Sequence, residues 1–109
     1  MSTDSLLLVL AIVSEVTATL ALRASDGLSR PLHAGLALAG YALAFTLLAR
    51  ALRTVPVGLA YGLWSGIGTL GVALAAWALW SESPAPQAWL GIAFVTVGSA
   101  LLGTALPAR

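Results

Sequence analysis

The chain has 109 residues, of which 60% are apolar and only 8% are charged, and its mean hydropathy is +0.98. Soluble domains carry about 25% charged residues, so this composition excludes a soluble domain and indicates an integral membrane protein. The net charge of +1 without a basic cluster gives no surface for nucleic acid, and the absence of cysteine rules out disulfides and thiolate metal sites.

Four apolar segments approach the ~20 residues that a bilayer-spanning helix needs. The expected spans are residues 5–22, 32–49, 57–80 and 88–106, separated by connectors that each contain proline. The first span is expected to be retained rather than removed as a signal peptide, because Asp4 precedes the apolar run and Glu15 interrupts it. Short connectors require consecutive helices to run antiparallel. The sequence therefore predicts a single all-α transmembrane domain over residues 1–109, with the lipid bilayer as its surroundings.

Basic residues on the two sides of the membrane are nearly balanced. Arg50, Arg53 and Arg109 are expected on one side, and Arg23 and Arg30 on the other. Positively charged connectors favour the cytoplasmic side, but three against two barely selects an orientation. The count permits insertion in both orientations, and with it a dimer of oppositely oriented chains, without requiring either.

Glu15 is the unusual residue of the first span. At about 1.5 Å per residue it lies roughly 15 Å from Ser5, near the middle of a hydrocarbon core about 30 Å thick. An acidic residue there costs about 2.5–3.5 kcal/mol on insertion scales, so such residues are rare and usually face a bundle interior or a wet cavity. We interpret Glu15 as a functional carboxylate. The alternative is a protonated glutamate that only hydrogen-bonds to a neighbouring helix.

The helix face around Glu15 is mostly small and carries one hydroxyl group. Its neighbours at helical spacing are Leu8, Ala11, Ala18, Thr19 and Leu22. Small side chains around a buried acid are consistent with a cavity or with a close contact between helices. The sequence leaves both interpretations open.

Two aromatic residues of the third span, Tyr61 and Trp64, stand three residues apart on one helix face. Tryptophan normally lies at the membrane interface because its N–H needs a polar partner, and Trp64 is too deep for that. Core packing is one explanation of a deep tryptophan. Together with a tyrosine and a buried carboxylate, Trp64 predicts a cation site in which the ring faces add to the attraction of the charge.

The third span is also rich in glycine, which lowers helix stability by up to about 1 kcal/mol per residue relative to alanine. Its glycines are Gly58, Gly62, Gly66, Gly68 and Gly71. One interpretation is close packing of another helix against the first three of them. The other is a bend at residues 66–68 that lets the two halves of the span move separately. Both can hold for one helix.

Taken together, SEVTAT in the first span, DGLSRP in the first connector and PVGLAYGLWSGIG in the third span resemble the small multidrug resistance family. The resemblance covers nearly the whole chain and includes a pair of glycines in the fourth span. It implies a proton-coupled antiporter that exports hydrophobic and quaternary-ammonium cations. The resemblance further implies an antiparallel homodimer in the bacterial cytoplasmic (inner) membrane, without a cofactor or a metal.

The resemblance also assigns roles to residues. Glu15 would bind the proton and the substrate in turn, Tyr61 and Trp64 would contact the substrate, and Tyr41 would lie nearby. The predicted substrate-binding set is completed by the small face around the acid and by the residue after the tryptophan, namely Leu8, Ala11, Ala18, Thr19 and Ser65.

Two further roles concern glycine. Gly66 and Gly68 would form the bend in the third span, and Gly91, Val95 and Gly98 would form the dimer contact. The spacing of the latter three independently places them on one face of the fourth helix.

Two positions separate this chain from the guanidinium-exporting branch of the family. The resemblance implies that this branch carries a tryptophan and a serine at the positions of Ala18 and Ala44. These two differences favour the quaternary-ammonium branch for this chain. The alternatives are a guanidinium-type exporter of small cations and a non-transporting accessory membrane subunit. An enzyme is disfavoured because no Cys, Asp or second carboxylate lies within the spans to pair with Glu15, and the one histidine, His33, stands at the start of the second span, where it is interpreted as an interfacial residue. A flippase subunit is disfavoured because an acid has the wrong sign for an anionic lipid-linked sugar.

Overall fold

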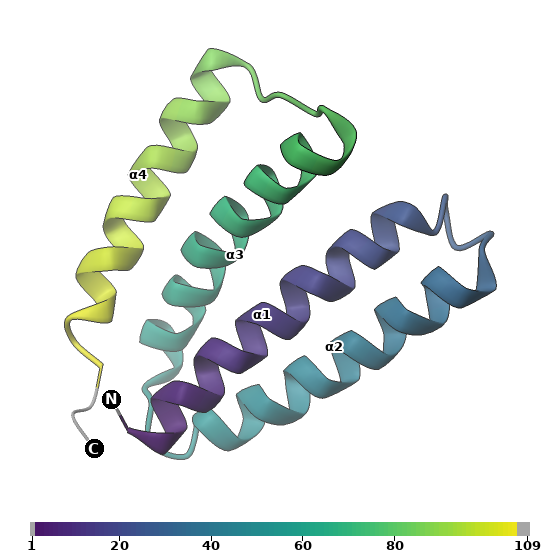
Figure 1. Ribbon diagram of the computed structural model, residues 1–109. Helices are drawn as coiled ribbons and strands as arrows, with labels where there is room; N and C mark the ends of the chain where they lie inside the picture. Colours follow the sequence, from purple (N-terminus) through teal and green to yellow (C-terminus); the bar gives the residue numbers. More distant parts are fainter. Residues whose placement is uncertain (1, 107–109) are drawn as a thin grey trace.

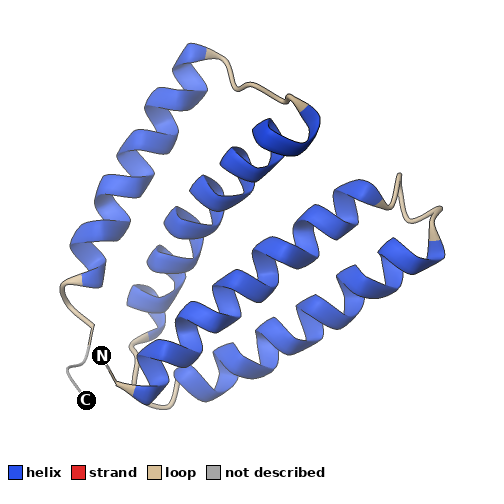
Figure 2. Ribbon diagram, viewed as in Figure 1, coloured by secondary structure: helices blue, strands red, loops and turns tan. Residues whose placement is uncertain are grey.

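The computed structural model describes residues 2–106, and in that range it contains α-helices and no strands (Figures 1 and 2). The helices are α1 (Thr3–Ala24), α2 (Pro31–Ala51), α3 (Val57–Trp80) and α4 (Pro86–Gly103). All four are long and apolar enough to cross a membrane. The prediction of an all-α chain with four membrane-spanning helices is confirmed.

Polar and proline residues set the ends of these helices. The Ser2 hydroxyl accepts a hydrogen bond from the Ser5 N–H at 3.1 Å and so caps the start of α1. Pro31 and Pro86 open α2 and α4, where the missing N–H of proline would have had no helical partner. As a result α4 begins two residues before the expected span at 88–106, and it ends at Gly103.

The helices form two antiparallel hairpins, α1 with α2 and α3 with α4, which contact each other through α1 and α3 (Figure 1). Small residues bring the helices of each hairpin close together. A methyl group at Gly40 would lie 2.7 Å from the Ala18 Cβ atom, which shows that α1 and α2 are nearly in backbone contact at this point. In the second hairpin, the Ser99 hydroxyl of α4 donates to the Gly62 carbonyl of α3 at 3.1 Å. Such close approach through small residues is typical of packing in membranes.

The two hairpins are joined at the end where α1 begins. The core there is built from buried side chains of α1, the end of α2, the connector after it and the first half of α3: Leu8, Ile12, Ala51, Val55, Ala60 and Leu63. At the rim of this core the Thr54 hydroxyl donates to the Asp4 carboxylate at 2.8 Å. Toward the other end the two hairpins diverge (Figure 1).

Large apolar side chains cover the outside of the molecule. Leu32 is 72% exposed and Phe94 is 71% exposed, and many other leucines and valines are exposed as well. Soluble monomers rarely expose such extensive apolar surface, whereas the hydrocarbon core of a bilayer solvates it. The chain is a multi-pass membrane protein. Arg109, which entered the topology count, lies outside the described residues.

Candidate functional site

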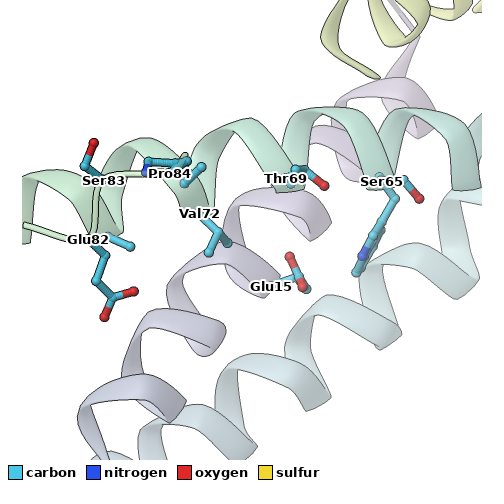
Figure 3. A pocket seen from close by; sticks show the side chains of 11 residues that line it. Glu15, Ser65, Thr69, Val72, Glu82, Ser83 and Pro84 are labelled. Carbon is cyan, nitrogen blue, oxygen red and sulfur yellow. The ribbon is translucent and has the colours of Figure 1, made fainter. Parts of the chain in front are cut away.

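A groove of about 630 Å³ lies between α1 and α3 and reaches the connector between α3 and α4. Glu15 enters it from α1, and Figure 3 shows its carboxylate directed toward the α3 face that carries Ser65, Thr69 and Val72. The remaining lining residues come from α3 and the connector: Trp64, Gly68, Ala73, Ala76, Glu82, Ser83 and Pro84. The predicted residues Glu15, Trp64, Ser65 and Gly68 are thus brought together.

The Glu15 carboxylate is half-buried and held on one side by a short chain of hydroxyl groups. The Thr19 hydroxyl, one turn further along α1, donates to Glu15 Oε1 at 3.2 Å. The same Thr19 oxygen lies 2.8 Å from the Tyr41 hydroxyl of α2. Because the single Thr19 proton goes to Glu15, Tyr41 must donate to Thr19. The chain orients Oε1 and leaves Oε2 facing the groove.

Among the described residues, 2–106, no positive counter-charge pairs with Glu15. Over residues 2–106, the Arg23–Glu82 pair is the only salt bridge. On the α3 side, a methyl group added to Gly68 would lie 3.5 Å from Glu15 Oε2. Open space and an unneutralised carboxylate therefore meet at the same point, which is the arrangement that a cation would complete.

Aromatic rings of α2 and α3 form a stacked row that ends at Trp64 on the groove. Tyr41 and Phe45 of α2 have ring centroids 6.3 Å apart, and Phe45 and Trp64 have centroids 6.1 Å apart with planes inclined by 4°. Phe45 links Tyr41 to Trp64, both of which were predicted, but Phe45 was not predicted itself. Its position one helical turn after Tyr41 is the signal that identifies it.

The other predicted substrate-binding residues lie elsewhere in the single chain. Tyr61 is 72% exposed and lines a smaller apolar hollow of about 140 Å³ between α2 and α3, which also contacts Trp64. Leu8, Ala11 and Ala18 are buried inside the bundle rather than on the groove. The small face around Glu15 therefore serves a close contact with α2 at Ala18, while the open space lies on the α3 side.

The glycines of α3 and α4 have different surroundings. A methyl group at Gly66 would overlap Ser99 of α4, so Gly66 is in close contact with that helix, and α3 is continuous from Val57 to Trp80. Methyl groups at Gly91 and Gly98 would meet nothing within 4 Å, and Val95 beside them is 41% exposed. The packing interpretation thus applies to Gly66 and to Gly62, where a methyl group would overlap Leu102, but not to Gly58, where it would meet nothing within 4 Å. The bend and the dimer contact stay predictions.

Several groove residues were missed by the sequence analysis. Thr69, Val72 and Ala76 follow Ser65 at helical spacing, so the pattern that relates Tyr61 to Trp64 also identifies them. Glu82 offered no such signal. It belongs to a connector outside the spans, and only the arrangement of the two hairpins brings that connector to the groove.

The sequence model of the Small Multidrug Resistance protein matches residues 4–95 of this chain. The chain belongs to the small multidrug resistance family. The multidrug transporter PA4990 of Pseudomonas aeruginosa is 43% identical to it over 96 residues, which are 88% of this chain and 87% of that protein. The quaternary ammonium compound-resistance protein QacE of Escherichia coli is 36% identical over 97 residues, covering 89% and 88% of the two chains.

Another relative of this chain is named for a different substrate. The spermidine export protein MdtI of Salmonella arizonae is 34% identical over 95 residues, covering 87% of each chain. The names of these relatives describe transport, export and resistance rather than a chemical reaction. Family membership confirms the resemblance seen in the sequence motifs.

Proposed function

We propose that this small multidrug resistance protein exports hydrophobic and quaternary-ammonium cations in exchange for protons. The observation that carries the proposal is the Glu15 carboxylate, which faces a partly apolar groove without a positive partner among residues 2–106. Relatives named for multidrug transport and for resistance to quaternary ammonium compounds support this substrate class.

The exchange follows from one carboxylate serving two ligands. A proton on Glu15 removes the charge that attracts a cation, and a bound cation stabilises the charged form that has no proton. The two ligands therefore exclude each other, and a proton gradient drives the cation outward when the site opens to each side in turn. Thr19 keeps Oε1 in place by its hydrogen bond, while the Trp64 ring offers a face that attracts cations.

The proposed working unit is an antiparallel homodimer in the bacterial inner membrane, with no cofactor beyond protons. Support comes from α4, where Gly91, Val95 and Gly98 present a small, open face on which a second copy of the helix can pack closely. In a dimer of oppositely oriented identical chains, the inward-open and outward-open states are the same structure with the chains exchanged. The two states then have equal energy, as alternating access requires.

The decisive experiment measures proton release from the purified protein when a benzyl-substituted quaternary ammonium cation is added. The parent should release protons, and Glu15→Gln should release none, because the amide keeps the shape but has no ionisable proton. Glu15→Asp is the matched control, since it keeps a carboxylate. It should still release protons, because its carboxyl group can bind a proton and a cation in turn.

The folding of each variant is checked by circular dichroism and by its elution volume on size exclusion. Undiminished release from folded Glu15→Gln would show that another group exchanges protons. Absence of binding to the parent would favour the alternative of an accessory subunit, in which Glu15 serves only assembly.

A further inference from the structure

The groove that contains Glu15 ends at a second carboxylate, that of Glu82. Glu82 belongs to the connector between α3 and α4, and Figure 3 shows it at the far end of the groove from Ser65. Of the acidic residues in the described part of the chain, Glu15 and Glu82 are the two that line this groove. A long ligand that begins at Glu15 and follows α3 therefore reaches Glu82.

Glu82 is already held by a cationic group. The Arg23 guanidinium at the end of α1 binds Glu82 Oε2 at 2.7 Å, and it also lies 5.0 Å from the centre of the Trp80 ring. The two side chains of the pair are 54% and 44% exposed. Exposed ion pairs are weak, so another cation can replace Arg23 at little cost. The Trp80 ring still attracts the displaced guanidinium.

The distance between the carboxylates of Glu15 and Glu82 can be estimated along α1, because Arg23 at the end of this helix binds Glu82. Arg23 follows Glu15 by eight residues, which corresponds to about 12 Å at 1.5 Å per residue. A ligand with one charge needs only Glu15. A ligand with two charges would leave its second charge unpaired in a mostly apolar groove, which is costly, unless that charge reaches Glu82.

We propose that Glu82 is an outer cation-binding carboxylate of this groove, so that a dication with charges about 12 Å apart binds Glu15 and Glu82 together after displacing Arg23. The inference rests on the proposed role of Glu15 as a cation site and extends it to the number and spacing of charges on the substrate. Arg23 then acts as a built-in competitor that favours substrates with a single charge.

The test uses polymethylene bis(trimethylammonium) dications of increasing chain length and alkyltrimethylammonium monocations of matched length. Their affinities for the purified full chain are measured by isothermal titration calorimetry, and the readout is the ratio of dication to monocation affinity. In the parent this ratio should peak at a charge spacing of about 12 Å. Glu82→Gln should lower the ratio about three- to fivefold, within the range of an exposed charge pair. Arg23→Gln should raise it, because it frees Glu82.

Two control variants each remove one charge, negative or positive, from the connector between α1 and α2. Asp26→Asn removes one negative charge at a residue with φ of 51°, a conformation that asparagine also adopts. Arg30→Gln removes one positive charge from an exposed side chain. Neither residue lines the groove, so neither variant should reproduce the opposite changes expected at Glu82 and Arg23.

The opposite directions of the changes expected for Glu82→Gln and Arg23→Gln distinguish a binding site from an ion pair with only a structural role. Glu82→Gln and Arg23→Gln break the same ion pair, so a purely structural role predicts changes in the same direction for both, with monocations and dications affected alike. That result would overturn the inference, and so would an equal effect of Asp26→Asn. Normal monocation binding with a ratio indifferent to Glu82 would overturn only the inference. Absence of any cation binding to the parent would overturn the proposed function as well.

Discussion

A methyl group added to Gly68 of α3 would lie 3.5 Å from Oε2 of Glu15 on α1. Glycine at this position therefore keeps open the side of the carboxylate that faces the groove. A methyl group fits at ordinary contact distance, but a larger side chain would occupy the space where a cation approaches Glu15.

The first prediction is that Gly68→Leu weakens binding of quaternary cations by roughly tenfold or more, because overfilling such a space costs about 1–3 kcal/mol. The helix itself should not suffer, since leucine favours helix more than glycine does. Gly58→Leu is the control, because a side chain there meets nothing within 4 Å. Cation affinity measured by calorimetry should fall only for Gly68→Leu. Equal affinities of the two variants would exclude an approach past Gly68.

The second prediction separates packing from bending at Gly66. A side chain at Gly66 would overlap Ser99, so Gly66→Ala should destabilise the contact between α3 and α4 by about 1–3 kcal/mol. Adding Ser99→Gly removes the side-chain atoms nearest to the new methyl group, although the Val95 carbonyl oxygen stays 2.9 Å from it and the hydrogen bond from Ser99 to Gly62 is lost. If Gly66 serves packing, the double variant should regain part of the thermal stability and of the transport in vesicles that Gly66→Ala loses. Recovery of stability without transport would show that α3 needs the flexibility of glycine at this point.

The third prediction concerns Trp64, which stacks on Phe45 and lines the groove. Trp64→Ala should weaken aromatic and quaternary cations by more than the ~0.5–2 kcal/mol of one cation–π contact, because the wall of the groove is lost as well. Trp64→Phe keeps an aromatic face and should bind better than Trp64→Leu, which keeps bulk alone. Parent-like affinity in Trp64→Leu would mean that Trp64 is a packing residue only.

The fourth prediction concerns orientation in the membrane. If the working unit is an antiparallel dimer, a tag at the C-terminus should be found in comparable amounts on both sides of the membrane. Two lysines added beside Arg30 should fix one orientation, because basic residues in short connectors act on topology. This position is preferable to Arg23, whose side chain pairs with Glu82. Export by the fixed variant alone should fall.

The matching control for this prediction is a second variant with two lysines beside Arg53, which favours the opposite orientation. Expressed together, the two variants should restore export, because each supplies the orientation that the other lacks. Full resistance from a chain shown to insert in one orientation would exclude the antiparallel dimer, and it would leave the role of Glu15 untouched.

Much of the fold follows from composition and from short local patterns. The apolar runs predict the four helices because backbone groups in a bilayer must be satisfied within the segment. Proline and polar residues between the runs locate the connectors. The ends of α4 lie two or three residues from those of the expected span, since hydropathy reports the depth of the membrane and not the residue at which a helix begins, here Pro86.

The candidate site was predicted in part. Glu15 stands out because an acid in an apolar run is costly wherever the helix lies, and Trp64 stands out because its depth is unusual for its type. Ala18 shows the limit of this approach. Its helical spacing places it on the face of Glu15, but which neighbour that face meets depends on the contact with Gly40 of α2.

The sequence by itself determined the solvent, the four spans and the one acid within them, because these depend on residue type and on position along a single helix. Only the tertiary structure decided that Thr19 and Tyr41 hold Glu15, that Gly66 meets Ser99, and that Glu82 ends the same groove. Contacts between segments depend on how the two hairpins are packed against each other. That packing is fixed by the fit of many side chains at once, which no local pattern records.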